Sequence, residues 1–395
     1  MTTARPLKVL HVVHALGMGG AETWLMEVLR RWSADGLGHM DFLLTGGARD
    51  LFDDEAERLG AHLHYVRYGR GDVRAFAGRL RDILRGEQYD AIHDHQDYVS
   101  GWHYLLGAGT LPPVRVTHVH NPWMHISANY AVTPSRRTAA YVGKRLVHRF
   151  ATHVCGTSAE VLRTYGFDEG GRNEPSVAVA HCGIDVAKFS QPREADRASV
   201  LREFAWPADT KLVLGVGRLD RALEFEHPQN HKNSWLALNV ARAAHAKDSA
   251  VRMIMAGGGE PQCVQIGGAI AEWGLQRDLR LAGVRLDVPR LMRAADVLLF
   301  PSRQEGLGMA AVEAQAAGLP VLASTAVPRE AVVVPELFEV LPLTASVEAW
   351  ADALLQRVAK PRPSLDVCRS ALERSPFSIV HSAERLVAIY RERAA

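Results

Sequence analysis

The stretch "LFPSRQEGLGMAAVEAQAAGLPVLAS", residues 299–324, places a glycine-bearing loop and a helix-forming segment between two apolar runs. The first run ends at Phe300 and predicts a buried strand, and "MAAVEAQAAG" is a run of strong helix formers. Gly318 suits the end of that helix, and Pro320 cannot continue it. The loop "RQEGLG" therefore lies at the carboxyl end of a strand, the edge at which open α/β sheets bind ligands.

The same alternation of apolar strand and helical segment extends along most of the chain. Runs of continuous apolar character with helices between them are typical of parallel sheets buried on both faces, so we predict an α/β, doubly wound fold. The predicted strands are 8–13, 40–44, 91–93, 114–119, 177–180, 212–216, 252–255, 279–281, 297–300 and 321–323.

Two halves are expected, because 395 residues exceed the roughly 100–200 residues of one domain. A polar, proline-bearing segment at 189–199 is followed by a new strand and glycine turn, "KLVLGVGRLD". We therefore predict domains at 1–190 and 191–375, with a cleft between them. The tail 376–395 predicts an amphipathic helix.

Composition narrows the class of protein. With 47% hydrophobic residues, 23% charged residues and a net charge of +2, the chain does not resemble a bulk nucleic-acid binder. Its cysteines are scattered and form no Cys-x-x-Cys pair, which argues against structural zinc and fits a reducing cytosol. No run of about 18 apolar residues is present. We expect a cytoplasmic protein.

Glycines follow the first predicted strand in "HALGMGGAETW", where Gly19 and Gly20 precede a helix. Such a turn either brings backbone N–H groups to a phosphate or simply connects strand and helix. A dinucleotide site would need glycine in place of Glu22 and an acid in place of Thr45, so a nicotinamide enzyme is not expected.

A second turn, "GVGRLD", carries Arg218, and Lys232 lies shortly before the next helical run. A guanidinium and an ammonium flanking a strand–loop–helix crossing suit a diphosphate. Two solvated surface cations are the alternative.

Glu305 and Glu313 bracket the glycine loop of the opening stretch. Gly306 and Gly308 allow the backbone to approach a ligand, and a rise of about 1.5 Å per residue puts Glu313 roughly 7 Å beyond Gly308. The two carboxylates could accept hydrogen bonds from two hydroxyl-bearing parts of one extended ligand with a charged middle. A loop acid and a structural helix glutamate remain the alternative.

The spacing from Glu305 to Glu313 matches the E-x(7)-E signature of retaining glycosyltransferases of the GT-B fold, and the stretch around it resembles glycosyltransferase family 4. "HVVHALGMGGAET", "YDAIHDH", "RVTHVHN", "HCGID", "GVGRLD" and "MAGGGE" are similar to further segments of that family, so the resemblance spans nearly the whole chain. It implies two Rossmann-like domains facing across a cleft, with a C-terminal helix crossing back to the N-terminal domain. "VTHVHN" and "EAQAAGLPVLAS" resemble exopolysaccharide-type members.

The resemblance also implies roles for residues. Arg218 would bind the donor diphosphate together with Lys232, Glu313 would hold the ribose, and Glu305 would read sugar hydroxyls. Whether Lys232 corresponds to the family's lysine stays open, because "LDRALEFEHPQNH" separates it further from Arg218 than in the family.

The remaining implied contacts come from both domains. His120 of the acceptor-binding N-terminal domain would lie near the reacting sugar. The backbone at Gly306, Leu307 and Gly308 would contact sugar and phosphates, and Gly19 and Gly20 would face the β-phosphate.

The expected function is that of a retaining hexosyltransferase moving a sugar from a nucleotide diphosphate sugar, with a UDP-sugar expected, to a hydroxyl acceptor in exopolysaccharide or other glycoconjugate synthesis. No cofactor or metal is expected, because no Asp-x-Asp pair occupies an expected donor loop and Arg218 and Lys232 would offset the diphosphate charge. A nucleotide-sugar epimerase of the same fold and an inactive sugar-nucleotide-binding protein are the alternatives.

A basic stretch, "PSRRTAAYVGKRLVHRF", includes residues 136–149. It is either a solvated helix face or a surface that meets anionic lipid or a lipid-linked acceptor. The second interpretation would put the protein peripherally on the inner face of a membrane.

Overall fold

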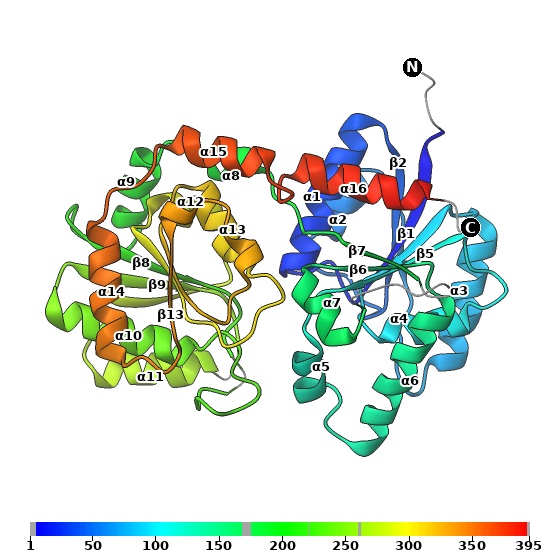
Figure 1. The fold of residues 1–395 in the computed structure, drawn as a ribbon, viewed down its shortest axis with the longest axis horizontal. Coiled ribbons are helices and arrows are strands. Elements are labelled where there is room, and N and C mark those ends of the chain that lie inside the picture. The colour runs from blue at the N-terminus through cyan, green and yellow to red at the C-terminus, as the bar shows by residue number, and fades with distance from the viewer. Residues whose placement is uncertain (1–4, 168–174, 221, 260–261, 393–395) are drawn as a thin grey trace. The chain divides into compact units, whose positions relative to one another are not determined.

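The computed structural model describes residues 5–167, 175–220, 222–259 and 262–392. The chain forms two compact units (Figure 1). One comprises Met1–Ile184 with Ile379–Ala395, and the other comprises Asp185–Ser378. The chain thus passes between units after residues 184 and 378, whereas the sequence analysis set these boundaries after residues 190 and 375.

The first unit contains a seven-stranded parallel sheet of order β3-β2-β1-β4-β5-β6-β7. The order reverses between β1 and β4, which is where such sheets bind ligands. Its strands are β1 (Leu7–Val13), β2 (Gly38–Leu44), β3 (Leu63–Tyr65), β4 (Ala91–Asp94), β5 (Val114–Val119), β6 (His153–Gly156) and β7 (Ser176–Val179).

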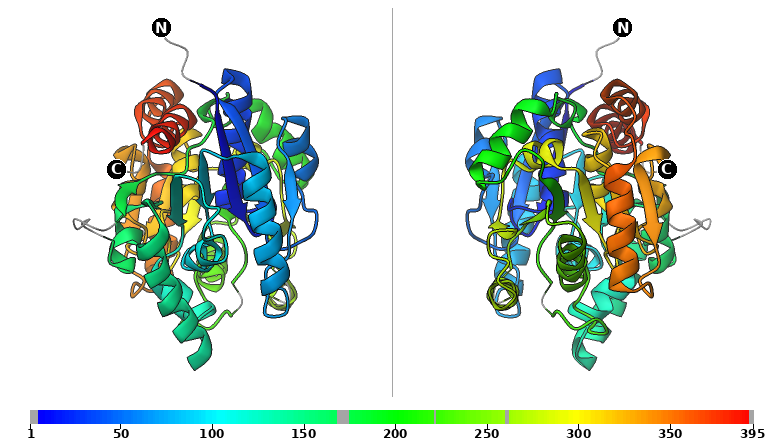
Figure 2. Two further views of the ribbon diagram at one scale, coloured as in Figure 1. Left: turned by 90° about the vertical axis from the view of Figure 1, so that its right-hand side faces the viewer. Right: turned by 90° about the vertical axis from the view of Figure 1, so that its left-hand side faces the viewer.

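Helices of the first unit bury apolar stripes; in α3, Phe76, Leu80, Ile83 and Leu84 recur at helical spacing. The helices are α1 (Gly20–Asp35), α2 (Asp53–Arg58), α3 (Val73–Glu87), α4 (Val99–Leu106), α5 (Trp123–Asn129), α6 (Pro134–Phe150), α7 (Ala159–Tyr165) and α16 (Ile379–Arg391). In Figure 2, left, α6 extends away from the sheet of its unit.

The C-terminal helix α16 belongs to the first unit and packs against α1 (Figure 1). The indole Nε1 of Trp24 donates to Ser382 Oγ at 2.9 Å, and Ser382 Oγ donates to the carbonyl of His181. The predicted return of this helix to the N-terminal half is confirmed.

The second unit contains a six-stranded parallel sheet of order β10-β9-β8-β11-β12-β13, which again reverses beside its first strand. Its strands are β8 (Lys211–Val216), β9 (Val251–Ala256), β10 (Leu279–Gly283), β11 (Val297–Phe300), β12 (Val321–Ser324) and β13 (Phe338–Leu341). Its helices are α8 (Val186–Phe189), α9 (Glu194–Glu203), α10 (Ser234–Lys247), α11 (Gln262–Glu272), α12 (Val288–Ala294), α13 (Met309–Ala316), α14 (Val347–Ala359) and α15 (Leu365–Arg374), with the 3₁₀ turns η1 (Arg329–Ala331) and η2 (Pro335–Leu337).

Each sheet has its own apolar core, and both repeat the Rossmann strand order. All ten predicted strands are present, and the predicted doubly wound α/β class is confirmed. The loops that follow β1, β8 and β11 carry most of the predicted site residues. Among the helices of the described part of the chain, none is long and apolar enough to cross a membrane.

Candidate active site

An ion pair lies at the switch point of the second sheet. Lys232 Nζ contacts both carboxylate oxygens of Glu305, at 2.7 and 2.9 Å. The Glu305 side chain is only 7% exposed, whereas that of Lys232 is 34% exposed. An ammonium has three donors, so this ion pair leaves Lys232 with capacity for a phosphate oxygen on its solvent side.

Asp220 determines where Lys232 lies. One carboxylate oxygen of Asp220 accepts the backbone N–H groups of His231 and Lys232, both at 2.7 Å. The other oxygen accepts the N–H and hydroxyl of Ser234 at the start of α10. The inserted segment follows Asp220 in the sequence, and its far end hydrogen-bonds back to the Asp220 carboxylate. This places Lys232 beside Glu305 despite the unusual spacing.

The glycine loop begins α13. Gly308 is the residue before the helix, with φ of +91°, and a Cβ there would lie 3.2 Å from Phe300 and 3.3 Å from Val327. Both the backbone conformation and the lack of space therefore require glycine. Phe300 in turn supports Lys232, whose Nζ lies 5.4 Å from the ring centroid.

Arg218 is exposed in the turn directly after β8. Burial lowers the pKa of His231, and the charges of Lys232 and Arg218 lower it further, while Asp220 and Glu305 oppose them. The charges of Arg218, Lys232 and Glu305 therefore all act on His231 in the second unit.

Glu313 lies in the second turn of α13 and is partly buried, and Leu307 is buried within the loop. The helix ends as predicted, because Gly318 follows it with φ of +63° and Pro320 leads into β12. The structure thus places Glu305 and Glu313 on either side of the start of α13.

In the first unit, Gly20 is the first residue of α1 and Gly19 immediately precedes the helix. A Cβ on Gly19 would lie 2.1 Å from a carboxylate oxygen of Glu22. The Glu22 carboxylate therefore folds back over the start of the helix, where the helix dipole favours a negative charge. A phosphate at this place would have to displace that carboxylate or share the position with it.

His120 directly follows β5 and is held at two points. Its backbone N–H donates to Asp97 Oδ1 at 3.0 Å, and its ring Nε2 lies 3.0 Å from His95 Nδ1. Asp97 also accepts from Asn121 Nδ2. His120 is partly exposed as a whole residue, and burial of its ring lowers the pKa to about 4. It is therefore neutral at physiological pH.

Two family descriptions match the chain in succession. "Glycosyltransferase Family 4" matches residues 18–188, and "Glycosyl transferases group 1" matches residues 211–360. The chain belongs to glycosyltransferase family 4. As a member of this family it is a retaining hexosyltransferase of GT-B fold that uses a nucleotide sugar.

Individual relatives of this family 4 enzyme match it over most of their length. "Putative glycosyltransferase EpsF" of Bacillus subtilis (strain 168) is 28% identical over 388 residues, which cover 97% of this chain and 96% of that protein. "D-inositol 3-phosphate glycosyltransferase" of Corynebacterium urealyticum is 26% identical over 336 residues, 81% of this chain and 76% of that protein. The crystal structure of Anabaena Alr3699/HepE with UDP-glucose has a TM-score of 0.73 and 18% identity, covering 97% and 98% of the two chains.

Sequence reasoning missed three residues that position this family 4 site. Asp220 fixes the lysine, Phe300 supports it, and Asp97 holds His120. Asp220 and Asp97 each lie a few residues behind a strand, which is a weak signal in a sequence. Asp97 also has φ of +51°, which no sequence pattern indicates.

Proposed function

We propose that this enzyme transfers a sugar from a UDP-sugar to a hydroxyl acceptor in the synthesis of exopolysaccharide or another glycoconjugate. The observation that carries the proposal is the contact of Lys232 with Glu305 at the switch point of the second sheet, beside Arg218. In this proposal Glu305 accepts hydrogen bonds from sugar hydroxyls, and the positive charges of Lys232 and Arg218 offset the negative charge of a diphosphate. These charges suit a nucleotide sugar, which carries both hydroxyls and a diphosphate. The solved HepE complexes with UDP and with UDP-glucose support the choice of nucleotide.

In the proposed reaction the acceptor hydroxyl attacks the anomeric carbon from the face that the diphosphate leaves. The bond from this carbon to the phosphate oxygen breaks, the bond to the acceptor oxygen forms, and a phosphate oxygen takes the acceptor proton. Arg218 and Lys232 stabilise the charge that develops on the leaving diphosphate. Glu305 and His120 orient the sugar through its hydroxyls, and Glu313 holds the ribose.

Turnover of the donor with and without acceptor tests the proposal. The enzyme is incubated with UDP-glucose or UDP-galactose and a polyprenyl-diphosphate-linked sugar, and release of UDP and the product anomer are followed by NMR. UDP release that depends on the acceptor, with retained configuration, is expected. Conversion of the donor to its epimer without acceptor would support the epimerase, and binding without turnover would support the inactive protein.

Glu313→Ala is expected to weaken UDP binding about 10–150-fold, because a hydrogen bond to a charged group is worth roughly 1.5–3 kcal/mol. The variant should stay folded, since Glu313 is only partly buried. Calorimetry with UDP and GDP measures the effect. Glu336→Ala, an exposed acid of the same unit, is the matched control. Unchanged affinity of Glu313→Ala for both nucleotides would contradict the ribose role.

We also propose that α6 meets an anionic membrane or a lipid-linked acceptor. Arg136 and Arg145 are exposed on it, with Tyr141 55% exposed and Tyr130, shortly before the helix, 46% exposed. The Arg145 guanidinium lies 5.1 Å from the Tyr141 ring centroid and donates to its hydroxyl. Basic and aromatic side chains on one projecting helix suit the interface of an anionic membrane.

Replacing both Arg136 and Arg145 by alanine is expected to weaken binding to phosphatidylglycerol-containing vesicles about 30-fold, at about 1 kcal/mol for each basic residue. Flotation with vesicles of increasing anionic content measures this. The double variant Arg74→Ala, Arg85→Ala removes two exposed arginines of α3 and should bind like the parent. Equal binding of the two double variants would show that α6 is an ordinary solvated face.

A further inference from the structure

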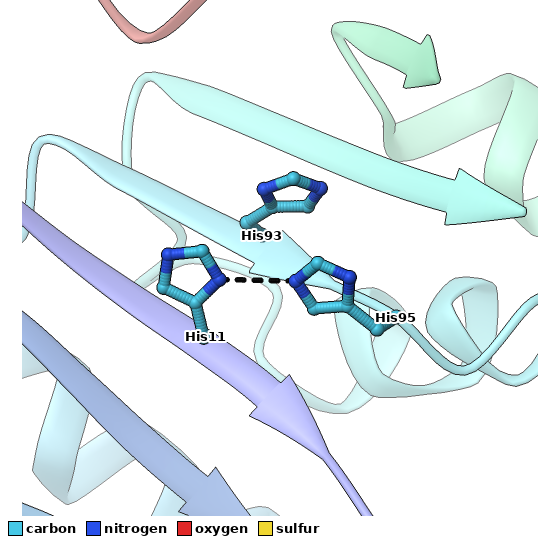
Figure 3. Close-up of side chains that lie close together, drawn as sticks. All are labelled: His11, His93 and His95. Carbon is cyan, nitrogen blue, oxygen red and sulfur yellow. Dashed lines mark hydrogen bonds between the residues drawn. The ribbon is translucent and has the colours of Figure 1, made fainter. Parts of the chain in front are cut away.

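Five histidines gather on one face of the first sheet. His11 lies in β1, His93 in β4 with His95 just after it, and His118 in β5 with His120 just after it. Alternate residues of a strand point to the same face, and His11 is opposite His93 in the register of β1 and β4. Figure 3 shows the rings of His11, His93 and His95 close together.

The cluster lies beneath Trp24 of α1, whose ring centroid is 5.3 Å from that of His118. His11, His93 and His118 are fully buried, and His95 is 8% exposed. So many imidazoles in an apolar core are costly unless their nitrogens find partners.

The nitrogens form two chains. His95 lies between His11 and His120, with a nitrogen–nitrogen distance of 3.0 Å to each. His93 lies between His118, at 3.2 Å, and the hydroxyl of Tyr390 in α16, at 2.5 Å.

A neutral imidazole has one N–H and one lone pair, so these chains leave nitrogens unused. Within the described residues, Nε2 of His11 and Nε2 of His118 are buried without a hydrogen bond, although the Ala180 carbonyl lies close enough to His118 to favour its charged form. A buried imidazole nitrogen without a partner is either an unused N–H or an unused lone pair, and in the second case it can bind a cation.

We propose that His95, His118 and His120 bind one divalent transition-metal ion of the Zn²⁺ class. Each of the three offers a ring nitrogen, and these nitrogens all lie within 4.8 Å of one another. A site made only of imidazole nitrogens favours Zn²⁺, Cu²⁺ or Ni²⁺ over Mg²⁺ or Ca²⁺. Three histidines leave a further position open, as in sites where zinc binds water.

The hydrogen bonds behind two of these residues, His95 and His118, fit ligand roles. The other nitrogen of His95 pairs with His11 Nδ1, and Nδ1 of His118 pairs with His93 Nε2. Partners of this kind fix the tautomer and orientation of a ligating histidine. Of the three residues, His120 is the least buried.

A rival inner group is formed by His11, His93 and His95, whose nitrogens also lie within 4.8 Å of one another. We favour the outer group because His120, its third member, is only partly buried, whereas all three members of the inner group are buried.

An ion bound at His120 would compete with the sugar contact that the proposed function assigns to this ring, so micromolar Zn²⁺ should inhibit transfer and EDTA should leave it unchanged or raise it. This consequence rests on the proposed function, whereas metal binding itself does not. A measurement of binding therefore separates a failure of the metal site from a failure of the proposed reaction.

Titration of the tag-free, EDTA-treated full chain with Co²⁺ and then Zn²⁺ tests the site. One Co²⁺ per chain is expected, with the intense visible absorption of a tetrahedral nitrogen site, and Zn²⁺ should abolish that absorption. His120→Ala should weaken binding more than about 100-fold, because loss of even a partner behind a ligand costs about 10–100-fold. Absence of the absorption in the parent protein would overturn the proposal.

Two further variants locate the ion. His11→Asn removes a partner behind His95 and should weaken Co²⁺ binding about 10–100-fold, whereas His62→Ala, with a side chain 71% exposed outside the cluster, should leave it unchanged. His118→Asn repeats the His120 test at a second ligand, with folding checked by circular dichroism. Full binding by folded His120→Ala and His118→Asn, with loss in His11→Asn, would assign the ion to the inner group and refute the proposal.

Discussion

His120→Ala should lower kcat about 10²–10³-fold, while the dissociation constant of the UDP-sugar stays within about twofold. In the proposed function this ring contacts the reacting sugar, and a contact that strengthens only in the transition state acts on kcat rather than on ground-state binding. The loss corresponds to roughly 3–4 kcal/mol of activation free energy.

The geometry supports an orienting role rather than a proton transfer. His120 is neutral because burial lowers its pKa to about 4, and Asp97 and His95 fix its backbone and ring. A neutral imidazole held in this way can exchange one hydrogen bond with a hydroxyl without rearranging. The kcat of the parent enzyme should therefore show no histidine titration near pH 6.5.

His118→Ala is the matched control, because His118 is two residues earlier on the same face of β5 but fully buried beneath Trp24. Its loss should lower the melting temperature more than kcat, since it leaves a cavity in the core. Stopped-flow kinetics gives kcat for both variants, and a separate binding measurement gives their dissociation constants for the donor. A near-normal kcat for His120→Ala would remove this histidine from the mechanism and leave the groups of the second unit unaffected.

The first unit should lose several kcal/mol of unfolding free energy as pH falls from about 6.5 to about 5. Burial lowers the pKa of His11 to about 3 and those of His93, His95 and His118 well below the usual value. In the unfolded chain these groups titrate near 6.5.

The sign follows from proton counting. Below pH 6.5 the unfolded chain takes up protons that the folded unit does not, so the stability is present above pH 6.5 and falls with pH. Each histidine costs about 2 kcal/mol over this interval, and the five, with His120 included, cost about 10 kcal/mol as an upper limit, comparable to the whole stability of a domain. Asp97, with its pKa raised to about 6 by burial, offsets about one of them.

Guanidinium unfolding followed by tryptophan fluorescence, from about pH 7.5 to about pH 5, measures the effect. His118→Phe replaces one titrating ring by an apolar ring and should give a shallower pH slope, whereas the exposed His62→Ala should keep the parent slope. A free energy of unfolding that does not change over this range would contradict the prediction.

The strands that the sequence did not reveal are short and carry weak patterns. β3 has three residues at one edge of its sheet, and β13 follows a 3₁₀ turn and is only half-buried. β6 lies inside the sheet, but its four residues begin with His153 and end with Gly156. Neighbouring strands, rather than residue preference, impose the extended conformation on such segments.

The residues of the candidate site likewise divide into those that local sequence predicts and those that depend on distant parts of the chain. Glu305, Gly308 and Gly318 were predicted with their local structure, because a strand, a loop and a helix follow one another directly in the sequence. The position of Lys232 could not be predicted, because it depends on the return of an inserted segment to Asp220. The two His-x-His pairs predict a shared face within each strand, but the register that brings His11, His95 and His120 together is a property of the assembled sheet.

Docking of α16 on the first unit constrains the order of events during synthesis. Residues 379–391 leave the ribosome after the whole of residues 185–378, yet they supply Tyr390 to His93 and Ser382 to Trp24. The second unit can therefore finish folding on the nascent chain, while the first, although synthesised earlier, waits for its last helix. During that interval the side of α1 that α16 covers is exposed, and a chaperone that recognises apolar segments should bind there.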